Sequence, residues 1–320
     1  MTAYRKVIAE ELAIFEDKFR DAVSTSNPLL NRILRYIVKR KGKQIRPTFV
    51  FLAARMCGTV SESTYRAAAL VELLHTATLV HDDVVDDSME RRGFFSINAI
   101  WKNKIAVLVG DYLLSKGLNL SLDNKDFEVL LILSTAVKQM SEGELLQMEK
   151  SRRLNLDETV YFEIIRNKTA SLLASCCAAG AWSSSQNREF TDKMRLFGEK
   201  TGVAFQIKDD LFDYGRDNVG KPTGNDIKEK KLTLPLIYTL NHCSAAKKRE
   251  LIYILKNKNR DKEKVQEVID TVKESGGIDY AISRMNEYRD EALEILFTFP
   301  ESEARNGMEE LVRFTTDRKY

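Results

Sequence analysis

The scarcity of helix-breaking residues constrains the fold of this chain more than any other feature. Only five prolines and 15 glycines occur among its 320 residues, so long segments run without interruption. Apolar residues recur in these segments at helical spacing, and no stretch shows the apolar–polar alternation of a half-buried strand. We therefore expect an all-α fold, a single-domain helical bundle that uses residues 1–320 as one domain.

The positions of these breakers and of candidate caps divide the chain into helices joined by turns. Residues 215–229 form the one substantial predicted loop. The predicted helices cover residues 4–23, 28–38, 47–57, 62–89, 97–121, 125–150, 157–182, 188–214, 232–240, 245–257, 262–274, 278–297 and 302–317.

Two aspartate clusters lie on otherwise apolar predicted helices, about half a chain apart. Aspartates four residues apart share one helix face, where like charges repel unless a cation lies between them. Carboxylate oxygens suit Mg²⁺, which completes its coordination shell with water and substrate phosphates. The pattern predicts two acidic helix faces on opposite sides of a central cavity. The predicted metal ligands are Asp82, Asp83, Asp86, Asp209, Asp210 and Asp213.

Basic residues near the first cluster are candidate phosphate ligands. Lys43 and Arg46 lie at the start of a predicted helix, where two cations and a helix N-terminus form a ready anion site. They could equally be a solvated basic turn. Arg91 and Arg92 could neutralise the preceding aspartates or bind two different phosphate groups.

Other polar residues interrupt apolar helices. His75 lies two turns before the first cluster and is either a core residue or a substrate ligand. Lys168 and Thr169 occur where their helix becomes small and apolar, which makes them candidate phosphate ligands, with a surface lysine as the alternative. Gln206 can donate a hydrogen bond into the second acidic site.

Just after the second acidic cluster, Lys221 and Lys231 bracket Asp226 in sequence. Their charge makes them further candidates for phosphate binding. The formal net charge of the whole chain is only +3, which does not favour a nucleic-acid partner.

The remaining composition favours a soluble, cytoplasmic protein. The four cysteines lack the spacing of a metal site or of a disulfide framework, so we expect a reducing compartment. The N-terminus has no apolar signal core, and we find no stretch of about 18 apolar residues that would span a bilayer.

Taken together and in this order, these motifs resemble the trans-isoprenyl diphosphate synthases, or polyprenyl synthetases, and particularly the long-chain, octaprenyl type. The resemblance covers the chain from its N-terminal helix to Arg318-Lys319. One departure is Lys230, where the family usually has Gly. The matching motifs are Gly42–Pro47, His75–Gly93, Gly110–Tyr112, Glu142–Glu144, Lys168–Thr169, Phe205–Asp213 and Gly220–Asp226.

The resemblance implies the isoprenoid synthase fold and a prenyltransferase activity. Such an enzyme condenses isopentenyl diphosphate with an allylic diphosphate, for example farnesyl diphosphate, in repeated Mg²⁺-dependent steps. Asp82 and Asp86 would hold two magnesium ions and Asp209 a third. The residues with implied catalytic roles are Asp82, Asp86, Asp209, Lys168 and Arg91.

The resemblance also assigns the two substrates. The allylic diphosphate would be held by Arg91, Lys168, Thr169, Gln206, Lys221 and Lys231. Isopentenyl diphosphate would be held by Lys43, Arg46, His75 and Arg92.

Product length follows from the residues just before the first motif. In this family bulky aromatic residues there stop chain growth early, whereas this chain has Ala77 and Thr78. We therefore expect a product longer than geranylgeranyl, and we choose Ile132 and Leu133 as the floor of the tunnel. A homodimer through the helix at residues 97–121 is expected, with transient membrane contact during product release.

Several alternatives remain at this point. A shorter-chain synthase would share every motif. A class I terpene cyclase shares the first acidic motif but usually has a different second motif and needs no site at Lys43 and Arg46. Regulatory subunits of heteromeric synthases tend to lose an aspartate motif, and both are intact here. A non-catalytic acidic helical protein would leave the basic partners unexplained.

Overall fold

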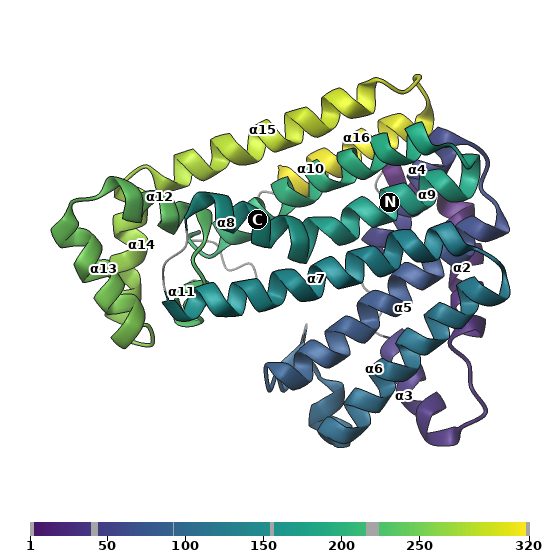
Figure 1. Cartoon of the computed structure of the whole chain (residues 1–320), viewed down its shortest axis with the longest axis horizontal. Helices are drawn as coiled ribbons and strands as arrows, with labels where there is room; N and C mark the ends of the chain where they lie inside the picture. The colour runs from purple at the N-terminus through teal and green to yellow at the C-terminus, as the bar shows by residue number, and fades with distance from the viewer. Residues whose placement is uncertain (1–2, 40–43, 92, 154–156, 216–223, 318–320) are drawn as a thin grey trace. The chain divides into compact units, whose positions relative to one another are not determined.

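The computed structural model describes residues 3–39, 44–91, 93–153, 157–215 and 224–317, and nearly all of its elements are helices (Figure 1). This confirms the all-α prediction. The helices are α1 (Ala3–Val7), α2 (Ala9–Ala22), α3 (Pro28–Val38), α4 (Ile45–Cys57), α5 (Glu62–Val85), α6 (Ile97–Asp123), α7 (Phe127–Arg153), α8 (Glu158–Ile165), α9 (Ser171–Ser185), α10 (Arg188–Phe212), α11 (Asn225–Lys228), α12 (Leu234–His242), α13 (Ala245–Asn257), α14 (Lys262–Glu274), α15 (Gly277–Phe297) and α16 (Glu303–Thr316).

The chain forms two compact units, each assembled from three segments. The helices α7, α9, α10 and α16 contribute residues to both units. The first acidic motif belongs to the first unit and the second motif to the second unit. The first unit contains residues 1–137, 175–195 and 299–308, and the second contains residues 138–174, 196–298 and 309–320.

The first unit is built around α4, which is apolar on nearly every side. Residues Phe49–Ala54 have no exposed surface, as expected for a helix that is hydrophobic all round. A Cβ atom added at Gly180 would lie 2.3 Å from the carbonyl oxygen of Val50. Glycine at this position therefore lets α9 approach the backbone of α4.

The pairing of α5 with α6 is the other main contact of the first unit. Leu73 and Ala77 of α5 share a buried cluster with Val109 and Leu113 of α6. By length and composition alone, α6 could cross a membrane, although no membrane-spanning stretch is predicted from the sequence. Its inner face packs against α5, which accounts for part of its apolar character.

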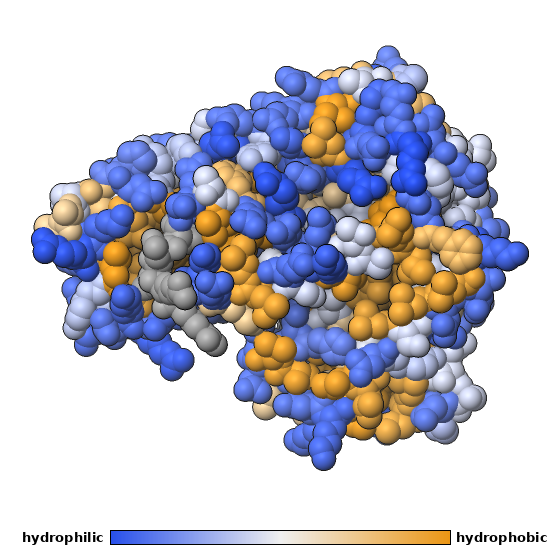
Figure 2. Space-filling model, viewed as in Figure 1, coloured by the Kyte–Doolittle hydropathy of each residue, from blue (hydrophilic) through white to orange (hydrophobic). Residues whose placement is uncertain are grey.

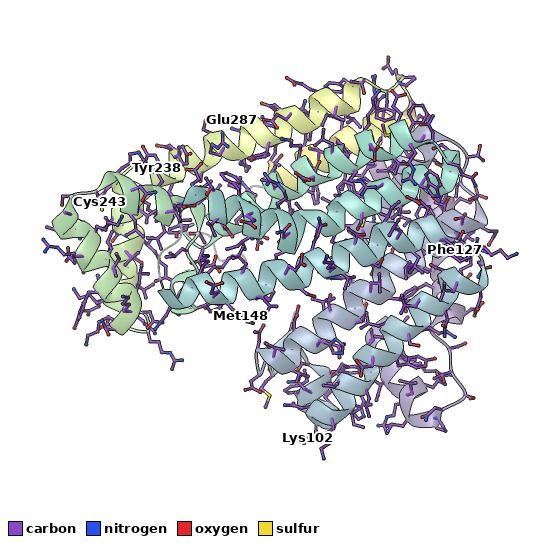
Figure 3. All side chains as sticks on the ribbon, viewed as in Figure 1. Lys102, Phe127, Met148, Tyr238, Cys243 and Glu287 are labelled. Carbon is purple, nitrogen blue, oxygen red and sulfur yellow. The ribbon has the colours of Figure 1, made fainter. Side chains whose placement is uncertain are left out.

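The second unit has its own core, built from α8, α10 and α12–α15. Ile207, Leu236 and Val268 are among its fully buried residues. Tyr238 of α12, labelled in Figure 3, stacks on Tyr280 of α15 with ring centroids 4.5 Å apart.

Several predicted boundaries differ from those observed. The first helix is interrupted at Ile8, where α1 ends and α2 begins. The helix predicted over 62–89 ends at Val85, because Asp86 lies at φ −88° and ψ 0° and Asp87 adopts a left-handed φ of 48°. Two short strands, β1 (Glu90–Arg91) and β2 (Phe94–Phe95), then form an antiparallel pair.

The helix predicted over 157–182 is divided into three. A π-helical segment, η1 (Arg166–Ala170), separates α8 from α9, and it includes Lys168 and Thr169. The predicted loop at 215–229 also contains the short helix α11.

All four cysteines are free, as predicted. Cys57, Cys176 and Cys177 are buried and Cys243 is half-buried. Burial raises the pKa of Cys57 and of Cys176 to about 12 and raises the pKa of Cys177 as well. These three thiols therefore behave as small core side chains.

Candidate functional site

The first acidic motif lies at the C-terminal end of α5. The backbone N–H of Asp86 donates to the carbonyl oxygen of Asp82 at 2.8 Å, so these two residues are one helical turn apart as predicted. Both are exposed, whereas Asp83 is buried. Asp87 lies beyond the end of α5 with a left-handed φ, so it does not continue the helix face that carries Asp83.

The start of α6 supports the end of α5. The side-chain amide of Asn98 donates to the carbonyl oxygens of Asp83, at 3.1 Å, and of Ser88, at 3.2 Å. The hydroxyl of Ser96 also donates to the Ser88 carbonyl oxygen, at 2.6 Å. These donors satisfy carbonyl groups at and just beyond a helix end, which has no intrahelical partners for them. Asn98, the second residue of α6, was not among the predicted site residues.

The predicted diphosphate ligands of the first unit are only partly described. Arg46 is half-buried in the first turn of α4, and His75 is buried in α5. The hydroxyl of Thr78 donates to the carbonyl oxygen of His75 at 2.8 Å. Predicted ligands that lie outside the described residues are Lys43, Arg92 and Lys221, together with the side chain of Arg91.

The four residues predicted to set product length are in or beside packed regions of the first unit. Ala77 has no exposed surface and belongs to the cluster between α5 and α6. Thr78 is half-buried. Ile132 and Leu133 of α7 are 4% and 0% exposed. Their role in product length stays a prediction.

In the second unit, the Asp210 carboxylate is fully buried and accepts three hydrogen bonds. Its Oδ1 atom accepts from Lys231 Nζ and from Gln206 Nε2, both at 2.9 Å. Its Oδ2 atom accepts from Tyr161 Oη at 2.8 Å. A buried charge of this kind requires such partners to offset its lost hydration.

The network continues from both ends. Thr169 donates its hydroxyl to Gln206 Oε1 at 2.7 Å, and Lys231 Nζ also lies 3.4 Å from Asp226 Oδ2. The structure therefore brings together four of the predicted site residues: Thr169, Gln206, Asp210 and Lys231. Tyr161 and Asp226, which also belong to this network, have no role predicted from the sequence.

The electrostatics of this network reflect two carboxylates around one ammonium group. Burial raises the pKa of Asp226 to about 7, even though Lys231 acts to lower it. For Lys231, burial acts to lower the pKa, but Asp210 and Asp226 raise it well above the usual value. Lys231 therefore stays protonated and its positive charge persists in the site.

The other two aspartates of the second motif have different environments. Asp209 is exposed. Asp213 lies beyond the end of α10, and its carboxylate accepts from the backbone N–H groups of Asn225, at 2.7 Å, and Asp226, at 3.2 Å. Asp213 therefore holds the start of α11, and burial raises its pKa.

Lys168 lies in the π-helical segment η1, a type of distortion that is frequent at functional sites. Its ammonium group pairs with the carboxylate of Glu144 and lies 3.3 Å from Gln147 Oε1. A Cβ atom at Gly143 would lie 2.8 Å from the Lys168 backbone nitrogen, and one at Gly202 would lie 2.5 Å from Ala170 Cα. The two glycines thus let α7 and α10 both approach η1 closely.

Three exposed carboxylates of the two motifs, those of Asp82, Asp86 and Asp209, have the hard oxygen atoms that Mg²⁺ prefers. Within the part of the chain that the structure describes, no three His, Cys, Asp or Glu residues form a metal site by themselves. Magnesium commonly uses only one or two protein carboxylates and takes its other ligands from water and substrate phosphates. The exposed carboxylates of each motif, taken separately, therefore suit this ion.

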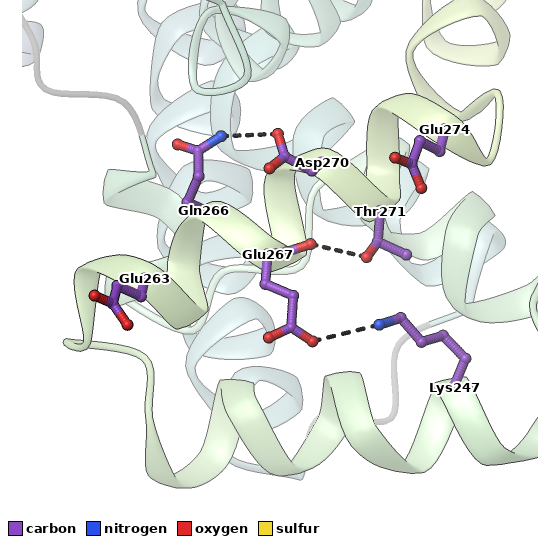
Figure 4. A pocket seen from close by; sticks show the side chains of 7 residues that line it. All are labelled: Lys247, Glu263, Gln266, Glu267, Asp270, Thr271 and Glu274. Carbon is purple, nitrogen blue, oxygen red and sulfur yellow. Dashed lines mark hydrogen bonds and ion pairs between the residues drawn. The ribbon is translucent and has the colours of Figure 1, made fainter.

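A separate hollow lies between α13 and α14 (Figure 4). Lys247 extends toward it, with its Nζ atom 3.4 Å from Glu267 Oε1. None of the predicted site residues lines it, and its Lys247 and Glu267 form an ion pair with each other. The lining residues are Lys247, Glu263, Gln266, Glu267, Asp270, Thr271 and Glu274.

Comparison with known proteins gives a consistent result. Residues 27–272 match the model of the family described as polyprenyl synthetase. The chain is 35% identical to the all-trans-nonaprenyl-diphosphate synthase (geranyl-diphosphate specific) of Rhodobacter capsulatus, over 97% of this chain and 96% of that protein. It is 30% identical to component 2 of the heptaprenyl diphosphate synthase of Geobacillus stearothermophilus, over 100% and 99% of the two chains.

Solved structures also resemble this chain over its whole length. The geranylgeranyl pyrophosphate synthase of Bacteroides thetaiotaomicron has a TM-score of 0.84 and 37% identity, and the match covers 99% of this chain and 98% of that one. The all-α architecture of the described residues is therefore the fold of these enzymes.

Proposed function

This chain belongs to the polyprenyl synthetase family, and from that premise we propose that it is a trans-polyprenyl diphosphate synthase, with residues 1–320 as one polyprenyl synthetase domain. It condenses isopentenyl diphosphate with an allylic diphosphate in repeated steps. The observation that carries this proposal is the network of Thr169, Gln206, Asp210 and Lys231. It assembles polar and cationic groups beside the exposed Asp209, as diphosphate binding requires.

The allylic diphosphate is held mainly from the second unit. Lys231 supplies a positive charge, and Gln206 and Thr169 supply hydrogen-bonding groups in the same network. Lys168 lies in the π-helical segment. In the substrate complex its ammonium group leaves the ion pair with Glu144 and binds phosphate oxygens instead. Arg91 and Lys221 complete the clamp.

Isopentenyl diphosphate is held by Arg46 of α4 and His75 of α5, together with two further basic residues of the recognised motifs. Arg46 lies in the first turn of α4, where the backbone N–H groups favour an anion. Lys43 and Arg92 add positive charge, and His75 donates from α5.

Asp82, Asp86 and Asp209 would hold Mg²⁺, with three ions expected in the allylic complex. When bound, magnesium neutralises the charge that develops on the departing diphosphate. Asp83 is buried, Asp210 is held by three protein donors, and Asp213 accepts from the backbone. A metal-ligand role for these three aspartates stays a prediction.

The reaction needs no nucleophilic side chain. The bond between C1 of the allylic group and the diphosphate oxygen breaks, and the double bond of isopentenyl diphosphate supplies the electrons for a new carbon–carbon bond. The resulting cation loses a proton, which the departing diphosphate accepts. The protein groups named above orient both diphosphates and stabilise the charge that leaves.

We propose a long-chain product, beyond geranylgeranyl. The small side chains of Ala77 and Thr78 and the nonaprenyl and heptaprenyl names of the full-length relatives support this assignment. Ile132 and Leu133 remain the proposed floor. The geranylgeranyl synthase of B. thetaiotaomicron supports the alternative of a shorter product.

A homodimer forms through the outer surface of α6. Figure 2 shows apolar side chains gathered over α6 and the first part of α7. Leu108 and Leu122 of α6 are 63% and 48% exposed, and Phe127 and Leu131 of α7 are 60% and 57% exposed. Exposed apolar surface of this extent is typical of an interface. The enzyme works in the cytoplasm and contacts a membrane only as the apolar product leaves.

The test is to incubate the purified protein with Mg²⁺, labelled isopentenyl diphosphate and farnesyl diphosphate, and to read product length by chromatography. A ladder that ends at seven or more isoprene units would support the long-chain synthase. A product that stops at geranylgeranyl would keep the enzyme class and overturn the product length. Consumption of farnesyl diphosphate without isopentenyl diphosphate would favour a terpene cyclase, and no reaction would favour a subunit that requires a partner.

A further inference from the structure

We propose that Tyr161 is a positioning residue for the second acidic motif: its hydroxyl fixes the Asp210 carboxylate, so that Lys231 and Gln206 are held ready for the allylic diphosphate. This inference rests on the proposed function and adds a residue that none of the recognised motifs contains.

Tyr161 lies in the first turns of α8 and is 2% exposed. Its Oη atom is 2.8 Å from Asp210 Oδ2. Burial, and then the charge of Asp210, raise the pKa of this phenol well above its usual value. The phenol therefore stays protonated and donates a hydrogen bond to the Asp210 carboxylate.

The two oxygen atoms of Asp210 have separate partners. Oδ2 accepts from Tyr161, whereas Oδ1 accepts from both Gln206 and Lys231. With Oδ2 satisfied by the phenol, the ammonium group of Lys231 is left to Oδ1 and to Asp226. The hydrogen bond from the Tyr161 hydroxyl thus limits how strongly the Asp210 carboxylate attracts the ammonium group of Lys231.

Gln206 transmits the same constraint to the π-helical segment. Its Nε2 atom donates to Asp210 and its Oε1 atom accepts from Thr169, which fixes the orientation of the amide. A rotation of the Asp210 carboxylate would therefore move Gln206 and disturb Thr169, both of which lie in the proposed diphosphate clamp.

The variant Tyr161→Phe removes only the hydroxyl. The ring packs edge-on against Phe162 at 5.4 Å between centroids, and phenylalanine retains that contact. Without the phenol, Oδ2 is a buried acceptor that lacks this donor, and the carboxylate competes more strongly for Lys231. The expected result is weaker binding of the allylic diphosphate.

Tyr214→Phe is the matched control. Tyr214 is also 2% exposed and lies in the same core. Its hydroxyl is paired with Thr233 Oγ1 at 2.5 Å and does not bond to Asp210. A loss caused only by removing a buried hydroxyl would affect both variants equally.

Steady-state kinetics on the full chain test the proposal. For Tyr161→Phe we expect the KM for farnesyl diphosphate to rise about tenfold, which corresponds to about 1.4 kcal/mol, while the KM for isopentenyl diphosphate stays within about twofold of wild type. For Tyr214→Phe we expect both KM values to be unchanged.

A thermal-shift experiment gives a second readout that needs no turnover. Mg²⁺ with inorganic diphosphate should raise the melting temperature of wild type and of Tyr214→Phe by similar amounts and that of Tyr161→Phe by clearly less. If Tyr161→Phe is destabilised but keeps the wild-type KM for farnesyl diphosphate and the full diphosphate shift, the residue is merely structural and the inference is overturned. If wild type itself fails to elongate farnesyl diphosphate, it is the proposed function that fails.

Discussion

Lys102 is the residue with the least favourable backbone conformation in α6. It lies at φ 73° and ψ 160°, a region that is essentially restricted to glycine, and its side chain is exposed. The conformation produces a kink near the start of α6, one residue after Trp101. Strain of this kind typically costs about 1–3 kcal/mol.

We therefore predict that Lys102→Gly stabilises the protein by about 1–2 kcal/mol, measured by denaturant unfolding. Lys104→Gly is the matched control, since Lys104 is also exposed but lies in the regular part of α6. That change should destabilise by about 1 kcal/mol. Equal effects of the two substitutions would contradict the assignment of strain to Lys102.

Product length is a second property that we expect single residues to set. We predict that Thr78→Phe shortens the product, because Thr78 is half-buried one turn before the first motif. Thr76→Phe is the control, since Thr76 is also half-buried but points about 200° away around α5. Chromatography of the labelled products measures product length for both variants. An unchanged product length for Thr78→Phe would contradict the prediction that Thr78 lines the path of the growing chain.

The structure also changes which variant is informative. Ala77 has no exposed surface and packs with Leu73 and Leu113. Phenylalanine there would overpack the core and cost about 1–3 kcal/mol. A shortened product from Ala77→Phe would therefore be hard to separate from general damage.

At the scale of elements, the π-helical segment η1 depends on its two neighbouring helices. A methyl group at Gly202 would approach Ala170 Cα to 2.5 Å, so backbone atoms would have to move. Movement of η1 displaces Lys168 and Thr169 together. The close packing of α10 is thus a condition for the position of the proposed clamp.

We predict that Gly202→Ala lowers stability by about 1–3 kcal/mol and reduces the rate of elongation, whereas Gly307→Ala has little effect on either. At Gly307 the nearest atom to an added Cβ is 3.3 Å away. Thermal unfolding and the condensation assay provide the measurements. A fully active, stable Gly202→Ala would show that α10 does not set the position of η1.

Most helices could be predicted from the sequence because long apolar periodicity and few breakers determine them locally. The ends of the motif helices could not. α5 ends before Asp86 and Asp87 because Asn98 and Ser96, at the start of α6, donate hydrogen bonds to the carbonyl oxygens of Asp83 and Ser88. The residues around the end of α5 give no local signal of this contact. The π-helical segment likewise depends on glycines of two other helices.

The candidate site, too, could be predicted from the sequence only in part. Thr169, Gln206 and Asp210 were found because polar residues stood out in apolar helices, and Lys231 was found because it follows the second acidic cluster. Tyr161 was missed because a tyrosine among apolar residues looks like ordinary core. Metal roles were predicted for Asp210 and Asp213 because the sequence does not distinguish one aspartate of a motif from another. Only the fold distinguishes a carboxylate held by protein donors from the exposed Asp209.

At the scale of the whole molecule, the apolar outer surface of α6 predicts the oligomeric state. We expect wild type to be a dimer in light scattering and Leu108→Glu/Leu118→Glu to be a monomer, because both leucines are exposed on α6 and burying the new charges would be costly. Leu196→Glu, at a leucine of α10 that is 45% exposed, should remain a dimer. A dimer that survives the double substitution would place the interface elsewhere.

The distribution of the cysteines has a practical consequence. Cys57, Cys176 and Cys177 are buried, with thiols that resist ionisation, and only the thiolate reacts readily with electrophiles. Cys243, at the end of α12, is half-buried. A maleimide dye should therefore label the folded wild-type chain once, at Cys243, and give a fluorescent reporter without any engineered site.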